Sequence, residues 1–72
     1  MALIKNIKIE GEFITLGQFL KVADIISSGG EAKSFLVTNR VLINNEEDNR
    51  RGRKLYKDDI VEIDRKQYRI CI

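Results

Sequence analysis

The chain has no histidine, no proline, no tryptophan and a single cysteine, Cys71, among its 72 residues. Without histidine it lacks the usual imidazole base of serine and cysteine hydrolases and the commonest zinc ligand. One cysteine allows neither an intramolecular disulfide nor a cluster of thiolates around a structural metal. These absences argue against catalysis, and we expect a non-enzymatic protein that needs no cofactor.

The short length sets a second limit. A chain of this size buries only about 60% of the surface that it exposes when unfolded, so residues 1–72 are expected to form a single domain. No uninterrupted apolar run approaches the roughly 18 residues of a membrane helix, and Lys5 interrupts the apolar start too early for a signal peptide. We therefore expect a soluble cytoplasmic protein that makes no contact with a membrane.

Charge is divided unevenly along the chain. Residues 1–49 carry five basic and seven acidic side chains, whereas residues 50–72 carry eight and four. Residues 50–54, Arg-Arg-Gly-Arg-Lys and hereafter the basic loop, place four cations in five positions, with no carboxylate after them until Asp58. The acidic run before them, residues 46–48, has neither the spacing nor the glycine of a calcium loop, and it is interpreted as a solvated turn that partly balances the arginines.

Hydrophobic periodicity predicts one clear helix. Its apolar residues fall at i, i+3, i+4 and i+7, the pattern of an amphipathic helix. They are Leu16, Phe19, Leu20 and Ala23. Thr15 and Gln18 have the spacing of a capping box, which predicts a helix over residues 16–26. Before it, alternating residues that end at Gly11 predict a short strand.

A second, shorter helix is expected after a glycine break. Gly29 and Gly30 interrupt the first helix, because glycine is unfavourable inside helices. Ser28 and Glu31 have capping-box spacing, and the following apolar face ends by Asn39. Two short helices joined in this way pack at an angle as one unit.

The remainder of the chain indicates strands. Residues 41–43 are apolar and run into Asn44-Asn45, a pair that tolerates left-handed turns. Residues 60–63 and 68–72 alternate on either side of Arg65-Lys66, which predicts a terminal hairpin, and Asp58-Asp59 is interpreted as a turn. The chain is therefore predicted to have an α+β fold.

Two segments are candidates for binding an anion. Backbone amides at Gly29 and Gly30 are open to a phosphate, but the Lys-Ser/Thr ending of a nucleotide-binding loop is missing, so a polymer phosphate fits better than a nucleotide. Lys33 and Ser34 lie in the first turn of the same helix. The alternative is a plain turn between helices.

The basic loop is the strongest local signal. Arginine's planar fork matches phosphate oxygens, which favours nucleic acid, while a loop that only improves solubility remains the alternative. The three Phe are expected to be internal, so a platform that stacks several bases is not expected. Recognition of the backbone shape of a folded RNA fits better.

Residues 14–63 resemble the RNA-binding domain named after small-subunit ribosomal protein S-four, and within that family the short stand-alone bacterial YaaA-type proteins. The resemblance covers about 50 of the 72 residues. It rests on the first helix, the glycine turn, the Glu31-Ala32-Lys33 helix start, the strand that ends in Asn44, and the basic loop followed by Asp59-Ile60-Val61. It implies the alpha-L motif, two helices in an L against a small, mostly antiparallel sheet, with RNA on the face of the second helix start and the basic loop.

Carried over by position, the resemblance makes Lys33 an RNA-facing basic residue, matches Asn44-Asn45 to the family's Asn-Gly turn, and makes the basic loop its variable RNA-facing segment. Two departures stand out. Gly29-Gly30 replace a Ser-Arg pair found in many members, and Asp58 stands where a glycine is usual.

We thus expect a monomeric module that binds structured RNA, ribosomal RNA above all, and associates with the ribosome. The predicted RNA-binding residues are Gly29, Gly30, Lys33, Ser34, Asn44, Asn45, Arg50, Arg51, Arg53 and Lys54. Two alternatives remain: binding of an acidic protein through the same arginines, and an accessory role beside a separate RNA-modifying enzyme.

Overall fold

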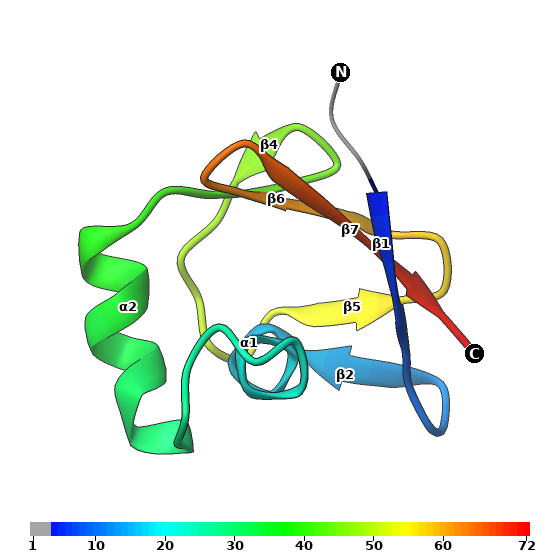
Figure 1. The fold of residues 1–72 in the computed structure, drawn as a ribbon, viewed down its shortest axis with the longest axis horizontal. Helices are drawn as coiled ribbons and strands as arrows, with labels where there is room; N and C mark the ends of the chain where they lie inside the picture. Colours follow the sequence, from blue (N-terminus) through cyan, green and yellow to red (C-terminus); the bar gives the residue numbers. More distant parts are fainter. Residues whose placement is uncertain (1–3) are drawn as a thin grey trace.

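The computed structural model describes residues 4–72 (Figure 1). The strands are β1 (Ile4–Lys8), β2 (Phe13–Thr15), β3 (Val41–Ile43), β4 (Glu46–Glu47), β5 (Lys54–Tyr56), β6 (Ile60–Ile63) and β7 (Lys66–Cys71). The helices are α1 (Leu16–Val22), the 3-10 turn η1 (Gly29–Glu31) and α2 (Ala32–Thr38). The α+β fold expected from the sequence is confirmed.

Five strands form the main sheet, in the order β1-β7-β6-β3-β4, and β2 pairs with β5 in a separate ribbon. All pairs are antiparallel except β1 with β7, which run parallel with Ile7 opposite Ile70. The terminal hairpin is confirmed, but its turn lies one residue earlier than expected. Asp64 and Arg65 have φ of 51° and 66°, the left-handed pair that a two-residue hairpin needs, so the second strand begins at Lys66.

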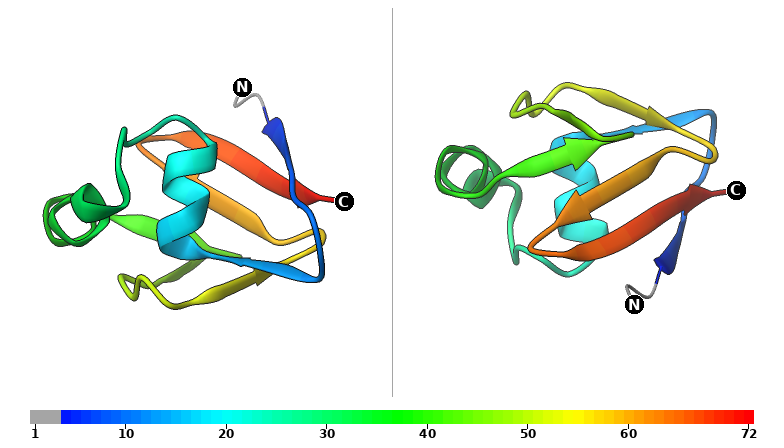
Figure 2. Two further views of the ribbon diagram at one scale, coloured as in Figure 1. Left: turned by 90° about the horizontal axis from the view of Figure 1, so that it is seen from below. Right: turned by 90° about the horizontal axis from the view of Figure 1, so that it is seen from above.

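The hydrophobic core lies between α1 and the main sheet. Figure 2 shows α1 crossing one face of that sheet. Phe19 and Leu20 of α1 are completely buried, as are Val61 and Ile70 on the facing strands. The Phe19 ring meets Tyr68 edge to face, with centroids 5.4 Å apart. Each such side chain contributes about 1.5–3 kcal/mol by leaving water, so the packing of α1 on the sheet is a main source of stability.

Helix α1 begins as predicted but ends early. The capping box of Thr15 and Gln18 is present, yet the helix stops at Val22 rather than at residue 26. Asp24 has φ of 61° and donates its N–H to Lys21 O, while the next N–H bonds to Leu20 O at 2.9 Å. This is a Schellman motif, with an aspartate at the position where glycine is usual. The glycine pair therefore does not end the helix.

The segment before α2 also differs from expectation. The side chain of Glu31 accepts hydrogen bonds from Ser27, 2.7 Å from its Oγ and 3.3 Å from its backbone N. Ser28 makes no capping hydrogen bond, so the expected Ser28–Glu31 box is wrong by one residue. Neither Gly29 nor Gly30 has a positive φ, and a Cβ at either would meet nothing within 4 Å. The pair leaves bare backbone on the surface without a conformational need for glycine.

The two helices form the expected L. In Figure 1 α1 is seen down its axis while α2 lies in the plane of the picture, and the views of Figure 2 reverse this. Helix α2 buries Ala32 and Leu36 and stands beside the sheet rather than on its face. Within residues 4–72, no helix is long and apolar enough to cross a membrane.

Candidate nucleic-acid interface

The basic loop is fastened to the start of α1 by its main chain. Leu16 N donates to Arg53 O at 2.7 Å, and Gly17 N donates to Arg51 O at 3.0 Å. The first N–H groups of a helix have no partner inside the helix, and the carbonyls of the basic loop fill two of these positions. The loop is thereby held at a fixed place beside α1.

Asp48 is a counter-charge for the basic loop. Its carboxylate accepts from Arg50 Nε at 3.1 Å and NH2 at 2.8 Å, from Arg50 N at 2.9 Å, and from Arg53 NH1 at 2.9 Å. The Asp48 side chain is only 9% exposed. The Arg50 guanidinium, the backbone N–H of Arg50 and the Arg53 guanidinium hold the pKa of Asp48 well below its usual range, against the opposing effect of burial.

The interpretation that residues 46–48 partly balance the arginines thus holds for Asp48. Arg50 and Arg53 therefore also act within the molecule, because both bond to Asp48 and fix the shape of the loop. Arg51 and Lys54 are exposed and form no ion pair within residues 4–72. They are the two cations of the basic loop available to a partner.

The surroundings of Lys54 correct a further expectation, which concerns Phe13. Its Nζ lies 4.9 Å from the centroid of the Phe13 ring. Phe13 is 41% exposed, so the expectation that all three Phe are internal is wrong for this one. The three-residue strand β2 alternates in burial, with Ile14 facing the core and Phe13 facing outward.

A shallow groove of about 690 Å³ lies between α1, η1 and the basic loop, and is called here the α1–loop groove. Its lining residues are Thr15, Gly17, Gln18, Lys21, Gly29, Ala32, Arg51 and Gly52. The fold thus brings Gly29 and Arg51, two of the predicted residues, to one surface. Lys21 was missed from the sequence, although its position opposite the apolar stripe, one turn after Gly17 and Gln18, marks it as belonging to the same face.

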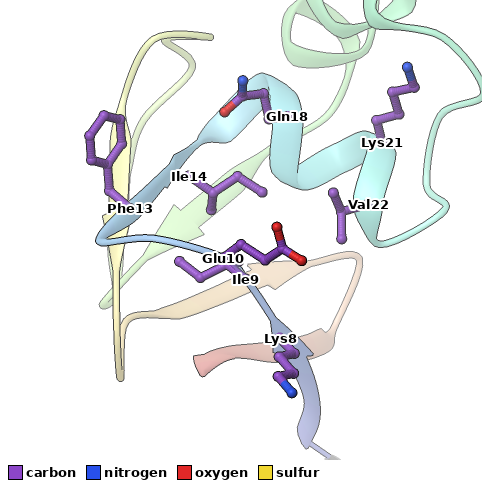
Figure 3. Close-up of a pocket in the computed structure, with 8 residues that line it drawn as sticks. All are labelled: Lys8, Ile9, Glu10, Phe13, Ile14, Gln18, Lys21 and Val22. Atoms are coloured by element: carbon purple, nitrogen blue, oxygen red, sulfur yellow. The ribbon is translucent and has the colours of Figure 1, made fainter. Parts of the chain in front are cut away.

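A second groove of about 600 Å³ lies on the other side of Gln18 and Lys21, between α1 and the segment that joins β1 to β2 (Figure 3). Figure 3 shows the carboxylate of Glu10 turned toward the space between Ile14 and Val22, whereas Lys21 points away from it. The lining of this second groove combines apolar side chains with one carboxylate, Glu10, and two lysines, Lys8 and Lys21.

The first turn of helix α2 carries Lys33 and Ser34, two of the predicted RNA-binding residues. Lys33 and Ser34 are exposed beside Gly30, while the buried Ala32 faces the α1–loop groove. Neither Lys33 nor Ser34 lines the groove, although both directly follow Ala32 in the chain. Ser34 is bonded through its carbonyl, which accepts from Thr38 Oγ1 at 3.0 Å.

Asn44 and Asn45 form the predicted turn, with φ of 52° and 71°. The side chain of Asn44 is already engaged: its Nδ2 donates to Asp59 Oδ1 at 3.1 Å, and its Oδ1 accepts from Ile60 N at 3.0 Å. Neither asparagine lines the α1–loop groove. The fold gives Asn44 a structural task and does not bring this turn to the other predicted residues.

Asp58, where the resemblance places a glycine, has a backbone conformation that glycine adopts readily. Its φ is 73°, a left-handed conformation that aspartate tolerates better than most residues. Its carboxylate accepts from Arg69 NH2 at 2.6 Å, and this hydrogen bond lowers the pKa of Asp58.

Comparison with known proteins identifies the family. The family model of the S4 domain matches residues 7–71, a longer stretch than the 14–63 on which the resemblance rested. The chain is 66% identical over 58 residues to the probable ribosome maturation protein RlbA of Bacillus subtilis (strain 168), an alignment that covers 81% of this chain and 82% of that relative. No solved structure matches. The resemblance seen in the sequence is confirmed, and the chain belongs to the S4 domain family.

Proposed function

We propose that residues 1–72 form a monomeric, non-catalytic module that binds structured RNA through phosphates laid along the α1–loop groove. The observation that carries this proposal is the attachment of the basic loop to α1, which sets Arg51 beside Lys21 and the bare backbone of Gly29. A surface that combines fixed cations with accessible main chain suits the regular spacing of a folded RNA backbone.

The residues divide by role in this proposal. Arg51, Lys54, Lys21 and Lys33 neutralise phosphates directly, because none of them has an ion-pair partner within residues 4–72. Arg50 and Arg53 share the Asp48 carboxylate, so together they offer one net charge and mainly shape the loop. Gly29, Gly30 and Ser34 allow the backbone to approach the RNA. Asn44 and Asn45 are peripheral contacts at most.

The curated relative supports a target connected with the ribosome. That protein is named as a probable ribosome maturation protein, and the alignment covers most of both chains. We propose by this likeness that the target is ribosomal RNA, that the protein associates with the ribosome or a precursor of it, and that it acts in the cytoplasm.

Fluorescence-anisotropy titration of structured ribosomal RNA fragments and length-matched duplex DNA, at three salt concentrations, tests the proposal. With about four phosphates engaged, log affinity should fall with log salt at a slope of about −3 to −4. The variant Arg51→Gln combined with Lys21→Gln should lower the slope by about 2 units. Lys66→Gln, which removes an exposed cation on β7 outside the groove, is the matched control and should change little.

Two results would contradict the proposal. A flat salt response, or equal binding by the native protein and the double variant, would show that the groove does not hold phosphates. Competition by unrelated polyanions but not by structured RNA would point instead to an acidic protein partner. Copurification with an RNA-modifying enzyme, tested by pull-down with the native chain, would identify an accessory role.

A further inference from the structure

The outer face of the β2–β5 ribbon carries an exposed pair of aromatic rings. Phe13 and Tyr56 are directly opposite each other in the antiparallel register, and they are 41% and 47% exposed. Their ring centroids are 6.0 Å apart, with a tilt of 49° between the rings. On the inner face of the same ribbon, Ile14 and Leu55 are buried. Figure 3 shows Phe13 turned away from Ile14, so the rings face solvent.

One lysine lies against this aromatic pair, and a second follows it in the chain. The Lys54 ammonium lies 4.9 Å from the centroid of the Phe13 ring, and Lys57, which directly follows Tyr56, is exposed. A half-exposed ring beside an ammonium group offers the two contacts that a nucleotide makes with a protein: stacking of its base and attraction of its phosphate. A purely apolar partner would gain nothing from the lysines.

The aromatic pair is continuous with the α1–loop groove. Strand β5 begins directly after Arg53, and Thr15, which ends β2, both lines the groove and pairs with Lys54. An RNA strand that leaves the groove past Arg51 therefore meets Lys54 next and the rings after it. Figure 1 shows β2 and β5 side by side, adjoining the start of α1.

We propose that Phe13 and Tyr56 form a stacking platform for one unpaired base of the bound RNA, whose phosphate lies against Lys54. This inference rests on the proposed function and makes it more specific. The preferred ligand is then a helix with an unpaired extension or loop, rather than a continuous duplex. The module reads phosphates in the groove and a single unstacked base beside it.

The test compares two RNAs that share one stem. The first is blunt, and the second carries three unpaired nucleotides that include 2-aminopurine, whose fluorescence is quenched by stacking. Stacking of one base on an aromatic ring corresponds to about 5- to 150-fold in affinity. The native protein should bind the extended RNA at least about fivefold more tightly than the blunt one, and binding should change the fluorescence of the 2-aminopurine.

Variants at the two rings test whether they cause the tighter binding of the extended RNA. Tyr56→Leu and Phe13→Leu should each reduce the advantage of the extended RNA while leaving the affinity for the blunt stem and its salt slope unchanged. Tyr56→Phe should retain the advantage. Val37→Ala, which shortens an exposed apolar side chain on α2, is the control and should behave as the native protein.

The outcomes separate the two proposals. Equal affinity for both RNAs, with salt-dependent binding and unchanged 2-aminopurine fluorescence, would overturn the platform and leave phosphate binding intact. Absence of salt-dependent binding to either RNA would overturn the proposed function itself. Cross-strand aromatic pairs also stabilise sheets. If a leucine variant unfolds, the ratio of the two affinities and the fluorescence of 2-aminopurine, both measured on the native protein, decide the matter without it.

Discussion

Replacement of Asp48 by asparagine tests whether one carboxylate shapes the basic loop. Asparagine has nearly the same size but no charge and only one acceptor oxygen. Asp48→Asn can keep the backbone hydrogen bond from Arg50 N, but it loses the paired contacts with the guanidinium groups of Arg50 and Arg53. We expect the loop to loosen from α1 and the protein to lose stability.

The magnitude follows from how exposed each contact is. The Arg50 guanidinium is 70% exposed, and an ion pair that is so open to water contributes little. The Arg53 side chain is 29% exposed and meets a carboxylate that is 9% exposed, so its charged hydrogen bond is worth about 1.5 kcal/mol, the lower end of the usual range. For a chain of this length, that loss lowers Tm by about 6–12 °C.

The effect should depend on pH in a definite direction. The pKa of Asp48 is lowered in the folded state, first by the hydrogen bond from Arg50, so the folded protein binds this proton less readily than the unfolded chain does. The stabilisation is complete above the unfolded pKa of about 4 and is lost as pH falls through the folded pKa. The difference in Tm between native and variant should therefore be largest at pH 7 and shrink at pH 3 and pH 2.

Thermal unfolding followed by circular dichroism at pH 7, 4, 3 and 2 measures this. Asp64→Asn is the matched control: Asp64 has φ of 51° in the β6–β7 turn, which asparagine also tolerates, and it forms no ion pair within residues 4–72. Asp58, whose pKa is also lowered, is the same in all three proteins and cancels. Equal Tm for native and Asp48→Asn at pH 7, or a gap that stays constant down to pH 2, would refute the reasoning.

Four further substitutions, at three positions, have defined outcomes. Gly17→Ala should be tolerated, because its Cβ would lie at an ordinary 3.5 Å from Arg51 O. Gly17→Leu should push the basic loop off α1, which lowers stability by about 1–3 kcal/mol and reduces both Tm and RNA affinity. Unchanged RNA affinity for the leucine variant would contradict the role of loop attachment. Asp24→Gly should raise Tm by several degrees, because glycine adopts the left-handed conformation at a free-energy cost about 1 kcal/mol lower than aspartate does. A fall in Tm would show that the Asp24 side chain makes a stabilising contact. Gly29→Val should change Tm only slightly, because the space around it is open, while RNA affinity measured by anisotropy falls. Equal affinity would remove Gly29 from the interface.

Several features could be predicted because they depend on local pattern. The spacing of Leu16, Phe19 and Leu20 defined the buried face of α1, and the capping pair before it defined the first residue. The Asn44-Asn45 turn and the terminal hairpin followed from turn chemistry and alternation. The run of cations and the pair of glycines are also visible in the sequence, but their part in an RNA interface stays a prediction.

Other features depend on contacts between distant segments. The end of α1 was missed because Asp24 takes the left-handed position that glycine normally marks. The parallel pairing of β1 with β7 joins the two ends of the chain and leaves no local signature. The outward direction of Phe13 was missed because a strand of three residues is too short to show alternation.

The composition and periodicity of this sequence determined an α+β fold with an angled helix pair, and they predicted phosphate-binding chemistry at the glycine turn and in the basic loop. The tertiary structure alone decided which of those cations are free. It joined Asp48 to two arginines, docked the loop on α1 through main-chain carbonyls, and brought Lys21 to the same groove. The reason is physical: side-chain periodicity records which residues are buried, whereas main-chain hydrogen bonds and ion pairs across a loop depend on distances that exist only after the chain has folded.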